Sequence, residues 1–206
     1  MANTLTKDIR NIVLLGHGGS GKTSLTEAML YKTGATNRLG SVIERTSICD
    51  YYDEEKEHQH SIQSAVVHIE HAGRLINIID TPGSPDFIGP AIKAIPAAET
   101  AVIVISTAAG IETNTRKLFT LATQADMPRL IVVNKIDAEN VDFPELIKGI
   151  QETFGPKCRC ANLPGADKAS VIDCIENQTG DSPLMDVAQA HTELIESVIE
   201  ASDELM

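Results

Sequence analysis

Residues 16–23 read Gly16-His17-Gly18-Gly19-Ser20-Gly21-Lys22-Thr23, the pattern G-x-x-x-x-G-K-[ST] of a phosphate-binding loop. The glycines let the backbone form a concave turn whose N–H groups point at phosphate oxygens. A helix starting near Lys22 adds its N-terminal dipole, and Lys22 itself supplies a charge for the β- and γ-phosphates. The Thr23 hydroxyl can ligate Mg²⁺. We therefore expect the octet, together with Ser24, to bind a nucleotide.

The sequence around this loop predicts an α/β fold with a mostly parallel sheet and helices on both faces. A strand over 11–15 enters the loop, and a helix over 24–31 leaves it and ends at Gly34. Further predicted elements are a hairpin of 64–70 and 74–80, strands over 101–105 and 130–133, and a helix over 112–125. The last two strands are almost wholly apolar, as strands buried on both faces should be.

Three other segments lack this regularity. Residues 36–60 carry many charges and little apolar periodicity, which predicts a long mobile loop. Residues 88–98 contain Pro90 and Pro96, so we expect the helix there to kink or end near Ile95. Residues 154–182 are rich in turn residues, although 169–173 can form a strand.

The composition is that of an acidic globular chain of 206 residues with a formal net charge of -12. This charge argues against a broad nucleic-acid-binding surface. No apolar run approaches the ~20 residues that span a membrane, and the first eight residues lack the apolar core of a signal peptide. We expect a cytoplasmic monomer whose four cysteines are free thiols.

A second motif, Asp80-Thr81-Pro82-Gly83, directly follows an apolar strand. A carboxylate at the C-terminal end of such a strand lies on the rim where α/β folds bind ligands. Beside a phosphate loop, Asp80 can hold Mg²⁺ through water, and the Gly83 N–H can approach a γ-phosphate. The order of the two motifs makes a nucleotide site more convincing than a simple turn.

A third motif, Asn134-Lys135-Ile136-Asp137, also ends an apolar strand. The Asp137 carboxylate can accept hydrogen bonds from N1–H and the 2-amino group of guanine, a donor pair that adenine lacks. Asn134 can contact the base and brace the phosphate loop, while the aliphatic stem of Lys135 covers one face of the base. Together the three motifs predict a guanine-nucleotide site.

These motifs and their order resemble the G domain of translational GTPases, with elongation factor G and its divergent paralogues as the nearest group. The resemblance extends to residues 50–65, which match the switch I pattern, and to 190–206, which match a helix ending in an Asp-Glu-Leu-Met-like run. It implies a three-layer P-loop NTPase fold, binding of GTP and GDP with Mg²⁺, GTP hydrolysis and a ribosomal partner. Within switch I, Glu57 stands at the family's glutamate and Ser61-Ile62 at its Thr-Ile, which adds Ser61 to Thr23 and Asp80 as expected magnesium ligands.

The chain departs from this family pattern in three places. Residues 57–61 read Glu57-His58-Gln59-His60-Ser61, where members usually carry Arg-Gly before a threonine. Ser84 replaces the histidine that positions the attacking water, so Ser84 and Gly83 stand at the catalytic positions. Two functions therefore stay open: a GTPase switch acting on the ribosome, and a GTP-dependent binding module with little hydrolysis.

The third departure concerns length, because the sequence stops at Met206 before the family's Ser-Ala guanine motif. We expect residues 1–206 to be a G-domain fragment of a longer protein, truncated before the last guanine-binding strand, with a possible G′-like insertion at about 155–185. Such a fragment should bind nucleotide poorly, with 36–60 as its least ordered region. The histidines are expected on the surface or in the switch loop and not at a metal: His58, His60, His68 and His71.

Overall fold

The computed structural model describes residues 5–139, 141–167 and 169–200, which divide into two compact units, Met1–Lys135 and Ile136–Met206. In the first unit the helices and strands follow one another in the order expected from the apolar runs. They are η1 (Thr6–Asp8), β1 (Ile9–Leu15), α1 (Lys22–Lys32), α2 (Asp53–His58), β2 (Ala65–His71), β3 (Arg74–Asp80), η2 (Pro85–Phe87), α3 (Ile88–Ala94), η3 (Ile95–Ala97), β4 (Thr100–Ser106), α4 (Thr113–Gln124) and β5 (Arg129–Asn134).

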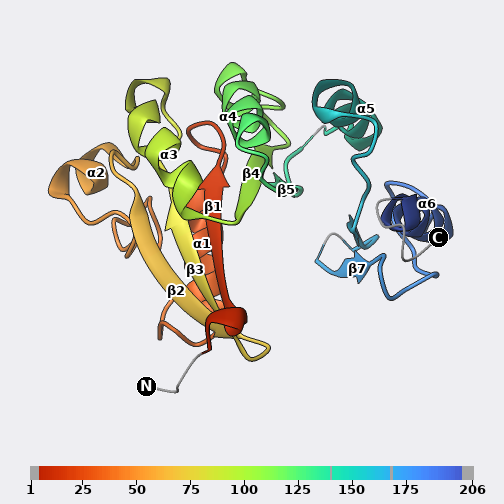
Figure 1. The fold of residues 1–206 in the computed structure, drawn as a ribbon, viewed down its shortest axis with the longest axis horizontal. Coiled ribbons are helices and arrows are strands. Elements are labelled where there is room, and N and C mark those ends of the chain that lie inside the picture. The colour runs from red at the N-terminus through yellow and green to blue at the C-terminus, as the bar shows by residue number, and fades with distance from the viewer. Residues whose placement is uncertain (1–4, 140, 168, 201–206) are drawn as a thin grey trace. The chain divides into compact units, whose positions relative to one another are not determined.

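The strands of this unit form one sheet in the order β2-β3-β1-β4-β5 (Figure 1). Strand β1 is parallel to both β3 and β4, β4 is parallel to β5, and only β2 runs antiparallel, in the hairpin with β3. The register pairs Leu14 with Asp80 and Ser106 with Asn134. Because parallel strands end at the same edge of a sheet, the three motifs all leave from this edge. The predicted α/β fold, with one antiparallel hairpin, is confirmed.

Apolar side chains fill both faces of the sheet. On one face Leu14, Val102 and Val104 form a buried cluster with Leu30 of α1. Their neighbours along the strands point to the opposite face, because side chains alternate along a strand. There Leu15 and Ile103 are completely buried, and α4 packs against β1 and β4. The core therefore anchors both ends of the phosphate loop.

The prediction of burial on both faces holds for β4 and is wrong for β5. Strand β4 is buried along almost its whole length, whereas Arg129 and Leu130 of β5 are exposed and the rest of that strand is half-buried. Strand β5 is less buried because it lies at the end of the strand order and so forms an edge of the sheet. An apolar composition does not distinguish a central strand from one at an edge.

The prediction of a long loop over 36–60 is wrong for residues 53–58, which form helix α2. The carboxylate of Glu55, at the third position of this helix, is buried and accepts hydrogen bonds from the N–H groups of Tyr52, Ile62 and Gln63. Its charge is therefore matched by backbone donors inside the fold. In the sequence the same charge indicated solvent exposure.

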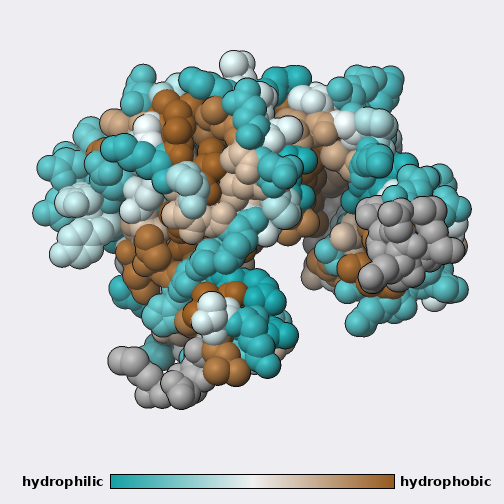
Figure 2. Space-filling view, viewed as in Figure 1, coloured by the Kyte–Doolittle hydropathy of each residue, from teal (hydrophilic) through white to brown (hydrophobic). Residues whose placement is uncertain are grey.

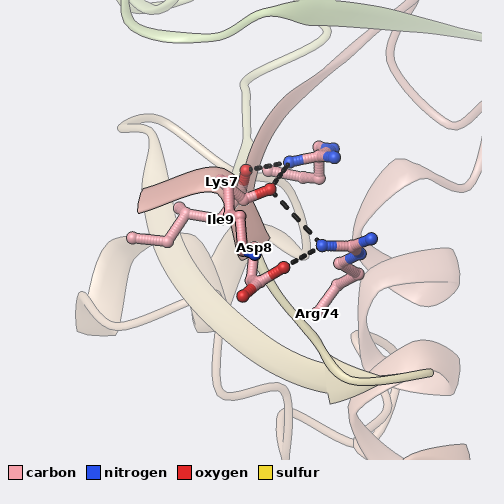
Figure 3. Close-up of polar contacts among 5 residues, drawn as sticks. Lys7, Asp8, Ile9 and Arg74 are labelled. Carbon is pink, nitrogen blue, oxygen red and sulfur yellow. Dashed lines mark hydrogen bonds and ion pairs between the residues drawn. The ribbon is translucent and has the colours of Figure 1, made fainter. Parts of the chain in front are cut away.

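Two local predictions are confirmed. Helix α3 ends at Ala94, and Pro96 lies in the 3₁₀ turn η3 that follows, as expected for a residue without an N–H. The turn of the β2–β3 hairpin lies at Ala72-Gly73. Figure 3 shows how η1 attaches near this turn, with Arg74 paired to Asp8 and close to the Lys7 carbonyl.

The second unit contains α5 (Phe143–Phe154), β6 (Asn162–Pro164), β7 (Val171–Asp173) and α6 (Val187–Glu200). Strands β6 and β7 pair antiparallel, which confirms the strand expected within 169–173. Leu163, Cys174, Val187 and Ala190 form a core of this unit alone. None of the four cysteines forms a disulfide, and residues 201–206 of the predicted terminal helix lie outside the described residues.

The surface mixes hydrophilic residues with separate hydrophobic areas (Figure 2). Several exposed apolar side chains belong to the segment before α2, including Ile43 and Tyr51, which are 79% and 78% exposed. Among the helices that the structure describes, none is long and apolar enough to cross a membrane.

Candidate functional site: a phosphate loop beside a cluster of oxygen donors

The phosphate loop connects β1 to α1, and its shape depends on glycine at position 21. Gly21 has φ of 95°, a left-handed conformation, and a Cβ atom there would collide with the Asn134 side chain. Asn134 occupies that space and donates from Nδ2 to the Ser20 carbonyl at 3.0 Å. The third motif therefore braces the first, a contact that the sequence suggested.

Lys22 lies under the loop with only 5% of its surface exposed. Its Nζ donates to the carbonyls of Gly16 and His17 at 3.0 and 2.9 Å. Burial lowers the pKa of Lys22 to about 8, although the nearby Asp80 carboxylate favours the charged form. The loop therefore holds one cation at its centre, aligned by main-chain oxygens.

Gly83 of the second motif packs directly against the loop. A Cβ atom at Gly83 would lie 2.5 Å from backbone atoms of both His17 and Gly18, so no side chain fits there. Asn114, at the start of α4, donates to the Gly83 carbonyl at 2.9 Å. The adjacent Thr115 hydroxyl accepts from the His17 N–H at 3.2 Å. The first turn of α4 thus fixes the spacing between the two motifs.

Hydroxyl and carboxylate oxygens meet beside the loop. The Thr23 hydroxyl donates to Asp80 Oδ2 at 2.6 Å and lies 3.3 Å from the Ser61 hydroxyl, which donates to Asp50 Oδ1 at 2.9 Å. Asp80 is 1% exposed, and its other oxygen, Oδ1, has no hydrogen-bond partner among the described residues. The three predicted magnesium ligands are therefore brought together, with Asp50 as a fourth oxygen donor that the sequence reasoning missed.

Burial controls the electrostatics of these carboxyl groups. It raises the pKa of Asp80 to about 6, against the opposing effects of the Thr23 hydrogen bond and the Lys22 charge. Burial also raises the pKa of Asp50. A buried carboxylate with an unpartnered oxygen is costly, and a divalent cation is one partner that offsets the cost. The all-oxygen donor set suits Mg²⁺.

Glu27 of α1 is a second residue that the sequence reasoning missed. It is completely buried, and its Oε1 accepts from the Ser47 hydroxyl and from the N–H groups of Ile48 and Cys49. This carboxylate ties the segment before α2 to the helix of the phosphate loop. Helical spacing offered a signal, because Thr23, Glu27 and Leu30 share one face of α1.

The remaining predicted residues are placed as follows. Thr81 is buried and its hydroxyl donates to the Leu14 carbonyl at 2.6 Å, while Pro82 is buried and Ser24 is exposed. Ser84 is half-buried and its carbonyl accepts from the Phe87 N–H. Lys135 is exposed with φ of 59° and is the last residue of the first unit. Ile136 and Asp137 belong to the second unit, where Ile136 is half-buried and Asp137 is exposed.

The histidines predicted on the surface or in the switch loop, His58, His60, His68 and His71, are all exposed. Within residues 5–139, 141–167 and 169–200, no group of three or more His, Cys, Asp and Glu side chains could hold a metal ion. The oxygen donors beside the phosphate loop are the carboxylates of Asp50 and Asp80 and the hydroxyls of Thr23 and Ser61.

Comparisons with known proteins agree with this geometry. The sequence matches the family described as "Elongation factor Tu GTP binding domain" over residues 7–206. It is 32% identical to an "Elongation factor G-like protein" of Mycobacterium tuberculosis over 95% of this chain and 29% of that protein. It is 36% identical to "Ribosome-releasing factor 2, mitochondrial" of Drosophila virilis over 76% of this chain and 22% of that protein.

A solved structure shows the same arrangement of elements. A crystal structure of a protein from Thermus thermophilus superimposes with a TM-score of 0.85 at 33% sequence identity. The match covers 96% of this chain and 32% of that chain. The chain therefore spans less than a third of the length of each of these relatives.

Proposed function

Because this chain belongs to the family of elongation factor Tu GTP-binding domains, we propose that it binds GTP and hydrolyses it to GDP as the switch of an elongation factor G-like translation factor. The observation that carries the proposal is the contact between the first two sequence motifs at one end of a parallel sheet, with Asn134 of the third motif hydrogen-bonded to the phosphate loop. The phosphate loop, Asp80 with Thr23, and Gly83 lie against one another through contacts between residues far apart in the chain.

The phosphate loop and Lys22 would hold the phosphates. The Lys22 ammonium already lies among main-chain oxygens of the loop, so it is aligned at the place where phosphate oxygens would bind. A charge-assisted contact of this kind is typically worth about 1.5–3 kcal/mol. Backbone N–H groups of residues 16–23 and the start of α1 would supply the other donors.

Thr23, Ser61 and Asp80 would hold Mg²⁺, which neutralises phosphate charge when it is bound. The support is the donor set itself and the unpartnered Oδ1 of buried Asp80. Ser61 belongs to the segment between α2 and β2, whereas Thr23 starts α1. A cation shared by the two would couple the position of that segment to the nucleotide state, as in switch proteins.

Guanine selectivity would come from Asn134, Lys135 and Asp137, with Ile136 between them. The hydrogen bond from Asn134 to the Ser20 carbonyl supports this part of the proposal, because it joins the first residue of the third motif to the loop. Asp137 is exposed. A carboxylate reads guanine because it accepts two hydrogen bonds from one edge of that base.

The ribosome is the proposed partner of the whole protein, since one relative is named as a ribosome-releasing factor. The expectations of a cytoplasmic location, a monomer and a G′-like insertion at 155–185 stay predictions. A second function, a GTP-dependent binding module with little hydrolysis, is favoured by one observation. Ser84 is a short, half-buried side chain at the position where the family carries a histidine.

Turnover of GTP by the full-length protein, measured with and without ribosomes, distinguishes these functions. Ribosome-stimulated release of phosphate supports the GTPase switch, whereas tight GTP binding without turnover supports the binding module. Competition by ATP as effective as by GTP would contradict both.

A further inference from the structure

We propose that His60 orients the water molecule that attacks the γ-phosphate, an inference that rests on the proposed GTPase function and names a further residue for it. His60 immediately precedes Ser61, whose hydroxyl lies 3.3 Å from the Thr23 hydroxyl and donates to Asp50. Its imidazole is exposed, so water can reach it.

The structure holds this imidazole against the second motif. The rings of His60 and Phe87 stack, with centroids 6.0 Å apart and an angle of 23° between their planes. Phe87 closes the turn that Ser84 opens, through the hydrogen bond from the Phe87 N–H to the Ser84 carbonyl. Gly83, one residue earlier, touches the phosphate loop. The segment before β2 and the turn that follows the second motif therefore meet at His60.

The hydrogen bond of His60 determines which ring nitrogen can accept a hydrogen bond from water. Its Nδ1 lies 3.0 Å from the His58 carbonyl, which can only accept, so in this contact Nδ1 carries the hydrogen atom. The tautomer that makes the contact leaves a lone pair on Nε2, which can accept a hydrogen bond from water. His17, the imidazole within the loop itself, has its Nε2 buried. Ser84 presents only a short hydroxyl.

In the proposed step the oxygen of the oriented water forms a bond to the γ-phosphorus. The bond from that phosphorus to the β,γ-bridging oxygen breaks, and its electron pair stays on GDP. The protons of the water end on inorganic phosphate and in solvent, so His60 need not keep one. Its contribution is orientation, which removes an entropic part of the barrier.

The test uses the full-length protein with ribosomes and compares four forms: wild type, His60→Ala, His68→Ala and the double variant His60→Ala/Ser84→His. His68 is an exposed histidine on β2 and serves as the matched control. Single-turnover GTP hydrolysis gives the rate of the chemical step, and a fluorescent nonhydrolysable GTP analogue gives affinity. We expect His60→Ala to lower kcat by about 100-fold or more with KM and analogue affinity unchanged.

The double variant should recover part of the lost rate, because a histidine at position 84 would stand in the same turn as Phe87. A wild-type kcat for His60→Ala overturns this inference and leaves the proposed GTPase intact. Equal losses of kcat and analogue affinity, without rescue, overturn it in favour of a structural role. A wild-type protein that binds GTP but never hydrolyses it overturns the GTPase proposal itself.

Discussion

At the scale of single residues, Lys22 offers the most direct test of nucleotide binding. Lys22→Ala removes a buried cation aligned by two carbonyls and should weaken GTP binding by roughly 10- to 150-fold, corresponding to about 1.5–3 kcal/mol. Lys32→Ala, at the exposed end of α1, is the matched control. Calorimetric titration of the full-length protein provides the measurement, and unchanged affinity in Lys22→Ala would show that residues 16–23 are only a loop.

Asp80 should make the stability of the protein depend on pH and, if it ligates Mg²⁺ as proposed, on Mg²⁺. Its pKa is raised to about 6, so the folded protein holds this proton more tightly than the unfolded chain does between about pH 4 and pH 6. The stabilisation from the raised pKa is therefore present at low pH and lost as pH rises through about 6. Without Mg²⁺, Asp80→Asn should raise stability at pH 8 by up to about 3 kcal/mol.

Denaturant unfolding at pH 5 and pH 8, with and without Mg²⁺, measures this effect. Wild type should gain stability from Mg²⁺ mainly above pH 6, where Asp80 is ionised, and Asp80→Asn should lose that gain. Asp86→Asn, an exposed change in η2, controls for loss of charge. Mg²⁺-dependent stabilisation that survives Asp80→Asn would remove Asp80 from the metal site.

Asp137 tests the choice of base. Asp137→Asn exchanges a carboxylate for an amide, which should weaken binding of guanine nucleotides and shift preference towards xanthine nucleotides. Competition among GTP, XTP and ATP in the full-length protein measures this preference, with Glu139→Gln as a nearby exposed control. If GTP remains preferred to the same degree, another group reads the base.

At the scale of elements, the segment between α1 and α2 depends on Glu27. Glu27→Ala removes the acceptor for the N–H groups of Ile48 and Cys49 and should increase hydrogen exchange at both amides by about tenfold or more. Glu44→Gln, an exposed change in the same segment, should leave exchange unaltered. Faster exchange throughout α1 would instead indicate that the helix itself has lost stability.

Elements were predictable from the sequence where local pattern determines the structure. The apolar runs and the turn at Gly73 predicted the hairpin, and Pro96 predicted the end of α3. Long-range contacts determine the rest. Glu27 and Glu55 are charged, and only contacts with backbone donors of other segments explain why they are buried. Likewise, the Thr115 hydroxyl accepts a hydrogen bond from His17 of the phosphate loop, 98 residues earlier in the chain. Local sequence patterns do not predict a contact between residues so far apart.

At the scale of the whole molecule, the two units have separate cores and should unfold separately. Leu163 is completely buried in the second unit, and Leu163→Ala should destabilise that unit by about 2–5 kcal/mol. Hydrogen exchange should be followed residue by residue at increasing denaturant concentration. In Leu163→Ala, the amides of 141–200 should lose protection at a lower denaturant concentration than in wild type, whereas the protection of β1 and β4 should not change. One shared transition in the variant would mean that the units are cooperative.

The close contact between Gly83 and the phosphate loop also has a genetic consequence. Every change in the first or second base of a glycine codon introduces a side chain or a stop, and any Cβ atom at position 83 meets backbone that cannot move aside cheaply. Codon 83 can therefore drift only at its third base. Codon 84 has no such restriction, because Ser84 is half-buried and already carries a side chain. Under selection for nucleotide binding, amino-acid substitutions can therefore accumulate at position 84, whereas only synonymous substitutions are expected at position 83.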